Sequence, residues 1–138
     1  AEFLTCFSEL KKRGIAVCVH LINGLPGETR EDMLESVKTV SALDPWAIKL
    51  HMLHVLRGTV CEAMYRNGEF RTFEKDEYVK LVCDELEHIA PHIVLQRLTG
   101  DGARSDLVAP LWSLKKFELL NAIDKEMNRR GSFQGIRT

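Results

Sequence analysis

Apolar positions along the chain follow two spacings, and these predict alternating strands and helices. Three short runs rich in β-branched and other apolar residues are expected to form strands, namely residues 15–22, 47–56 and 92–101. Around them, apolar residues recur every three or four positions, which predicts helices near residues 2–13, 29–43, 74–89 and 111–130. Glycine or proline ends these segments at Gly14, Pro45 and Pro91.

The predicted order, α-β-α-β-α-β-α, is typical of an α/β fold with parallel strands and crossover helices. Three such strands fit either a small open sheet or part of a (β/α) barrel. In both cases functional groups gather where the strands end, here at residues 24–28, 55–59 and 99–106. We find no domain boundary within residues 1–138, and we expect residues 132–138 to form a frayed tail.

Composition narrows the possible partners. The 138 residues carry 19 basic and 20 acidic side chains, so the net charge of −1 does not indicate nucleic-acid binding, although the C-terminal end is locally basic. No apolar run approaches the roughly 20 residues that span a bilayer, and no signal peptide opens the chain. The chain begins with Ala inside a helical pattern, which we interpret as a truncation.

Cysteine and histidine positions do not indicate a metal site. The four cysteines, Cys6, Cys18, Cys61 and Cys83, form no CxxC pair, so we interpret them as reduced thiols of a cytoplasmic protein. His51 and His54 are three apart on one predicted strand and are therefore expected to face opposite sides. His20 and His51 could share a face, but no metal ligand is assigned.

The most specific local feature is the turn INGLPGET after the first strand. Gly24 and Gly27 allow the backbone to approach a ligand, Pro26 fixes the turn, and Glu28 begins the next helix. The segment lacks the GKS or GKT of a nucleotide P-loop. A tight connection between strand and helix, without function, would have the same sequence.

Three ordered segments extend this signal: VCVHLINGLPGETREDMLESV, KLHMLHVLRGT and QRLTGDGARSDLVAPLWSLKK. Together they resemble the radical S-adenosylmethionine superfamily, in particular bacterial proteins related to the Elongator catalytic subunit and to oxygen-independent coproporphyrinogen oxidase. The resemblance extends from about Phe3 to about Gly135. It implies that residues 1–138 form the C-terminal half of a partial TIM-like (β/α) barrel.

The resemblance also implies site residues. In that family a turn after the fifth strand and the backbone at the end of the sixth strand contact the adenine of S-adenosylmethionine; the matching positions are Ile22, Gly24, Glu28, His54 and Val55. Strand parity and position at the rim make Lys49, His51, Arg97 and Asp101 the candidate substrate contacts. No catalytic residue is assigned.

The sequence departs from the family pattern in one respect. The CxxxCxxC motif that holds a [4Fe–4S] cluster is absent, as is the glycine-rich motif for the methionine part of the cofactor. The implied parent enzyme cleaves S-adenosylmethionine reductively to a 5′-deoxyadenosyl radical, which abstracts hydrogen from an unknown substrate; tRNA and small molecules are both conceivable. This chain alone is expected to be inactive without the N-terminal half of the barrel.

The alternative is a small, non-redox α/β module that binds a nucleotide or phosphate through the NGLPGE turn. Such a module should cover its apolar strands completely. A half-barrel should instead expose an apolar edge and tend to associate.

Overall fold

A computed structural model describes residues 2–100 and 102–138 of the chain. The elements follow one another along the chain as α1 (Glu2–Lys12), β1 (Cys18–Asn23), α2 (Arg30–Ala42), β2 (Ala47–Met52), β3 (Val55–Leu56), α3 (Val60–Arg66), α4 (Lys75–His88), β4 (Val94–Arg97), β5 (Leu107–Ala109), a 3₁₀ turn (Leu111–Leu114) and α5 (Lys116–Arg130). The mixed α/β class and the three main strands agree with the prediction from sequence.

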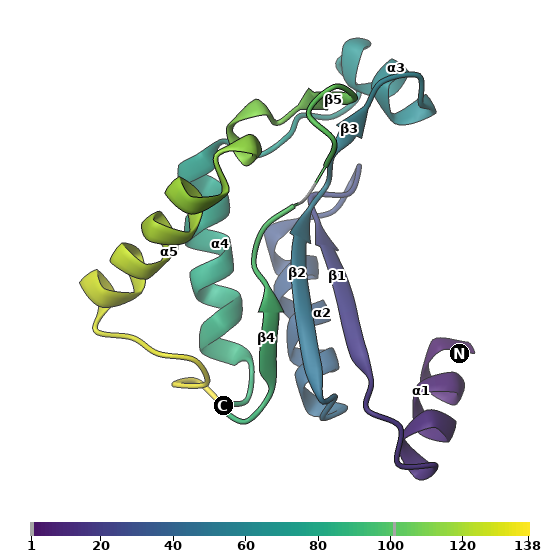
Figure 1. The fold of residues 1–138 in the computed structure, drawn as a ribbon, viewed down its shortest axis with the longest axis vertical. Helices are drawn as coiled ribbons and strands as arrows, with labels where there is room; N and C mark the ends of the chain where they lie inside the picture. Colours follow the sequence, from purple (N-terminus) through teal and green to yellow (C-terminus); the bar gives the residue numbers. More distant parts are fainter. Residues whose placement is uncertain (1, 101) are drawn as a thin grey trace.

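The central sheet has the order β1-β2-β4, and both strand pairs are parallel. All three strands run toward β3 and β5, so their C-terminal ends lie on one side of the molecule (Figure 1). The register pairs Ile22 with His51 and Asn23 with Met52. The pairing of β2 with β4 shifts between Ile48 and Lys49, which brings Arg97 opposite Lys49.

Helices cover only one face of the sheet. In Figure 1, α2 lies behind β1 and β2, while α4 and α5 lie to the side of β4. Side chains alternate accordingly: the covered face carries the buried residues Val19, Asn23, Ile48, Leu50 and Met52. On the other face Ile22 is 46% exposed and Val94 is 43% exposed. This uncovered face is mixed, because it also carries His20, Lys49 and His51.

The entry into α2 is fixed by local hydrogen bonds. The hydroxyl of Thr29 accepts from the backbone N–H of Asp32 at 3.2 Å, and the Asp32 carboxylate accepts from the backbone N–H of Thr29 at 2.9 Å. This capping box satisfies two N–H groups that the helix itself leaves unpaired and is worth on the order of 1 kcal/mol. It fixes the end of the turn formed by residues 24–28.

Three connections differ from the sequence prediction. The run 47–56 is not one strand, because β2 ends at Met52 and β3 pairs antiparallel with β5, a strand that sequence patterns did not predict. Residues 60–66 form α3, a helix that the apolar spacing did not predict. The predicted helix 111–130 is a 3₁₀ turn followed by α5.

The C-terminal segment 132–138 is not the frayed tail expected from the sequence. The backbone N–H of Gly135 donates to the carbonyl of Leu86, and that of Arg137 donates to the carbonyl of Glu87 at 2.9 Å. The Gln134 amide donates to two carbonyls near the end of α4, at 2.9 and 2.8 Å. The polar composition predicted fraying, but these bonds attach the segment to the last turn of α4 and to the connection that follows it.

Candidate functional site

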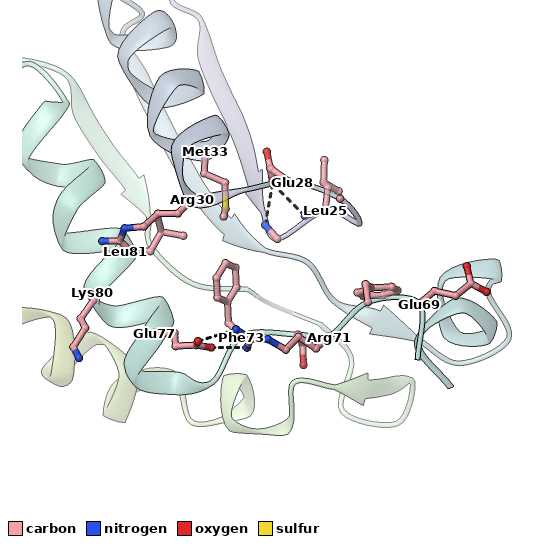
Figure 2. A pocket seen from close by; sticks show the side chains of 14 residues that line it. Leu25, Glu28, Arg30, Met33, Glu69, Arg71, Phe73, Glu77, Lys80 and Leu81 are labelled. Carbon is pink, nitrogen blue, oxygen red and sulfur yellow. Dashed lines mark hydrogen bonds and ion pairs between the residues drawn. The ribbon is translucent and has the colours of Figure 1, made fainter. Parts of the chain in front are cut away.

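The turn after β1 is held by the carboxylate of Glu28. Its Oε2 accepts from the backbone N–H groups of Gly24 at 3.1 Å and Leu25 at 3.2 Å, as Figure 2 shows. Gly24 has a φ of 84°, a conformation that residues with a Cβ rarely adopt. Glu28 therefore stabilises the conformation of the turn through hydrogen bonds to its backbone.

A pocket of about 520 Å³ lies behind this turn, between the start of α2, the segment 69–73 and α4. The ring of Phe73 packs against Gly24. The guanidinium of Arg71 forms two hydrogen bonds with the Glu77 carboxylate (Figure 2). The Arg71 hydrogen bonds, with the Glu74 backbone N–H, lower the pKa of Glu77 to about 2. Arg71 and Glu77 neutralise each other and add no net charge to the pocket. The rest of the lining contains both acidic and basic side chains.

One apolar side chain and two imidazoles lie near the C-terminal ends of β1 and β2. Ile22 is the register partner of His51, and the rings of His51 and His54 lie edge to face with their centroids 4.9 Å apart. Ile22, the second-last residue of β1, is exposed to solvent, whereas both histidines are partly buried. Together they form a corner with an apolar wall and polar edges.

One ring nitrogen of His51 has a defined protonation state. Its Nδ1 lies 2.5 Å from the carbonyl oxygen of Met52, and because a carbonyl only accepts, Nδ1 must carry the proton. In the neutral imidazole Nε2 is then an acceptor. His51 can thus accept a hydrogen bond from an amino or hydroxyl group at this corner.

The expectation that His51 and His54 face opposite sides is wrong. Parity applies only while the strand continues, and β2 ends at Met52, so the backbone turns before His54. Gly100 and Gly102 enclose the His54 ring: a Cβ built at Gly100 would come within 2.2 Å of His54 Nε2. Even so, no group of three or more metal-ligating side chains occurs within residues 2–100 and 102–138.

The remaining predicted residues are spread over the strand ends. Val55 is fully buried in β3, so only its main chain can meet a ligand. Lys49 on β2 and Arg97 on β4 are register partners. Lys49 lies two residues before His51 in the same strand. Asp101 lies outside the described residues.

Sequence reasoning missed a buried polar pair beside the turn. Asn23, the last residue of β1, is 2% exposed and donates from Nδ2 to Glu85 of α4 at 2.9 Å; Glu85 is fully buried. A signal existed in the sequence, because Glu85 occupies an apolar position of the helical pattern that includes Tyr78, Leu81, Val82, Leu86 and Ile89.

The cysteines are all free thiols. Cys83 is buried, Cys18 and Cys61 are partly buried, and Cys6 is exposed. Burial raises the pKa of the Cys83 thiol to about 11, which makes it unreactive. Within the described part of the chain, no helix has the length and apolar character to cross a bilayer.

A parallel sheet with helices on one face and a glycine turn at the strand ends is typical of part of a β/α fold, a class of fold in which ligands bind at the C-terminal ends of the strands. The family model of the radical SAM C-terminal domain matches residues 45–129. This match covers more than half of the chain, so the chain belongs to that family within the radical S-adenosylmethionine superfamily, as the resemblance implied.

Known relatives are considerably longer. The chain is 48% identical to YtqA of Bacillus subtilis over 98% of its own length and 43% of that protein. It is 25% identical to the tRNA uridine(34) acetyltransferase of Methanocaldococcus infernus, over 88% of this chain and 23% of that relative. The structure of Elp3 from Methanocaldococcus infernus with an N-terminal deletion superposes with a TM-score of 0.73 over 91% of this chain and 29% of that chain; at 22% identity it supports the fold. The chain thus spans less than half the length of these relatives.

Proposed function

We propose that this chain supplies the adenine-side wall of the cofactor site, and part of the substrate cavity, in a longer radical S-adenosylmethionine enzyme. The observation that carries the proposal is Ile22, an aliphatic side chain 46% exposed at the C-terminal end of β1, on the uncovered face of the sheet. Covering an exposed apolar side chain with another apolar surface is favourable, and the flat face of adenine would supply such a surface.

The described residues fit one part of the cofactor only. Ile22 and the main chain at Gly24 would hold the adenine ring from one side, and the main chain of His54 and Val55 would meet its edge. Glu28 acts indirectly, since its carboxylate keeps the turn in shape. The chain contains no CxxxCxxC, so cluster ligands would have to come from elsewhere in the enzyme. When bound and reduced, the cofactor supplies a radical for hydrogen abstraction.

Substrate contacts would come from the same face. Cationic groups would come from Lys49 on β2 and Arg97 on β4. His51 would supply a hydrogen-bond acceptor, and Asp101 an acidic group. Both a tRNA and a small polar molecule remain candidates, and the named tRNA-modifying relative favours testing tRNA. The four free thiols support our further proposal that the enzyme works in the cytoplasm.

The phosphate-binding alternative is disfavoured by the turn itself. The amides of Gly24 and Leu25 that would cradle an anion already donate to the Glu28 carboxylate. A phosphate would have to displace this carboxylate and approach its negative charge.

Two matched substitutions test the cofactor role in the intact, cluster-reconstituted enzyme. Ile22→Asp and Val94→Asp both place a carboxylate at a half-exposed apolar position of the same sheet face, but at opposite ends of the strands. We expect Ile22→Asp to raise the Kd for S-adenosylmethionine by roughly tenfold or more, the value of one lost apolar contact. Val94→Asp should leave Kd within about twofold. Equal effects of the two substitutions would refute the adenine-side assignment.

A further inference from the structure

The Asn23 side chain connects the end of β1 to the interior of α4. Asn23 Nδ2 donates to Glu85 Oε2 at 2.9 Å, and both side chains are almost completely removed from solvent. A buried polar group with a satisfied partner strengthens its surroundings, whereas loss of the partner leaves an amide unpaired in the core.

The backbone of Asn23 forms a second connection. Its carbonyl accepts from the N–H of Leu53 at 2.8 Å, directly after β2 ends. Asn23 also lies between Ile22 and Gly24, the two residues proposed to hold adenine. The position of one side chain therefore fixes the ends of two neighbouring strands.

We propose that Glu85 is a positioning residue for the cofactor site, which acts through Asn23 by holding the ends of β1 and β2, and with them Ile22 and the Gly24 turn, in place. Its functional consequence rests on the adenine-side role proposed above; the positioning itself does not.

The protonation of Glu85 bears on this role. Its second oxygen, Oε1, is buried without a hydrogen-bond partner among the described residues. Burial raises the pKa of Glu85 to about 8, although the Asn23 hydrogen bond lowers it. Near neutral pH the group is thus a carboxylic acid whose Oε2 still accepts from Asn23, and Gln can reproduce that acceptor.

Charged neighbours of Glu85 come from two elements. Glu28 of the turn raises its pKa and Arg30 of α2 lowers it. On α4 itself, burial raises the pKa of Tyr78 and the neighbouring Glu85 raises it further; the Tyr78 hydroxyl donates to the Leu98 carbonyl. The groups from α5 are engaged elsewhere: Arg130 pairs with Asp84, Glu87 and Glu126. The covered sheet face opposite Glu85 offers Asn23 beside apolar side chains.

Amide hydrogen exchange in the intact protein, without cofactor, tests the positioning directly. The probes are the N–H of Leu53 and those of Gly24 and Leu25. Glu85→Leu should lower their protection about tenfold, the effect of losing one buried hydrogen bond, and Glu85→Gln should keep it within about twofold. The control Val82→Ala creates a cavity next to the same helix. It should lower protection throughout the core, with no larger effect at these three amides than elsewhere.

Asn23→Ala covers the case in which Glu85→Leu does not fold, because it removes the other partner of the same hydrogen bond. It should also lower the protection of the Leu53, Gly24 and Leu25 amides about tenfold. The proposal is overturned if either variant keeps Leu53 protected, or if Glu85→Gln loses as much protection as Glu85→Leu. Cofactor affinity is measured separately: if exchange responds as expected while S-adenosylmethionine binding is insensitive to both Glu85→Leu and Ile22→Asp, the positioning role stands and the adenine-side role fails.

Discussion

The ring of Phe73 lies against the α-carbon of Gly24, so close that a Cβ added at Gly24 would come within 2.7 Å of Phe73 Cε2. The contact joins the turn after β1 to the segment that leads into α4. Phe73 in turn packs against Tyr78, with ring centroids 5.9 Å apart, and Tyr78 packs against Trp112 at 5.6 Å. The turn therefore rests on an aromatic stack that reaches the 3₁₀ turn before α5.

Gly24→Ala and Gly27→Ala separate this contact from backbone strain. The two glycines have nearly equal φ values, 84° and 83°, but a Cβ at Gly27 would meet nothing within 4 Å. Both substitutions cost about 1 kcal/mol for the positive φ. We expect Gly24→Ala to cost roughly 1–3 kcal/mol more, from overpacking against Phe73, in denaturant unfolding. Similar losses for the two variants would show that Phe73 moves aside freely.

Gly100→Ala should displace the His54 ring. A Cβ at this position would also lie 2.9 Å from Met52 Sδ, which accepts from the Gly100 N–H. We expect overpacking to lower the free energy of unfolding by about 1–3 kcal/mol. The chemical shifts of the His51 and His54 ring protons should change as well. Gly58→Ala serves as a control for glycine replacement away from the histidines. Unchanged ring resonances in Gly100→Ala would contradict the observed packing.

Glu85 makes the stability of the fold depend on pH. Its pKa of about 8 in the folded protein lies above the ordinary glutamate value of 4.5, so the folded state binds the proton more tightly. The stabilisation is complete below about pH 4.5, declines as pH rises toward 8, and is lost above that. Subtracting the unfolding free energy of Glu85→Gln from that of wild type should isolate this decline, on the order of a few kcal/mol. A flat difference from pH 5 to 8 would show that Glu85 is already ionised.

Arg137 should matter more than its exposure suggests. Its Nε donates at 2.5 Å to Glu87, whose side chain is 5% exposed, so Arg137→Met removes one of two cationic partners from a buried carboxylate. We expect a loss of about 1–3 kcal/mol in thermal or denaturant unfolding. Arg129→Met, which removes an exposed pair with Glu126, should have no measurable effect. If both variants unfold like wild type, the C-terminal segment does not stabilise α4.

The sequence by itself determined the α/β class and the order of the main elements. Those features depend on local apolar spacing and on glycine and proline at the ends of the elements. Tertiary structure decided where local patterns stop: β2 ends at Met52, which brings His51 and His54 together, and the tail packs on α4.

Only the packed structure could also pair Asn23 with Glu85, or Phe73 with Gly24. Glu85 stands out in the sequence as a charge at an apolar position, but its partner is 62 residues away. The energy of such a pair comes from excluding water around both groups, and the folded chain alone determines which distant side chains share that dry environment.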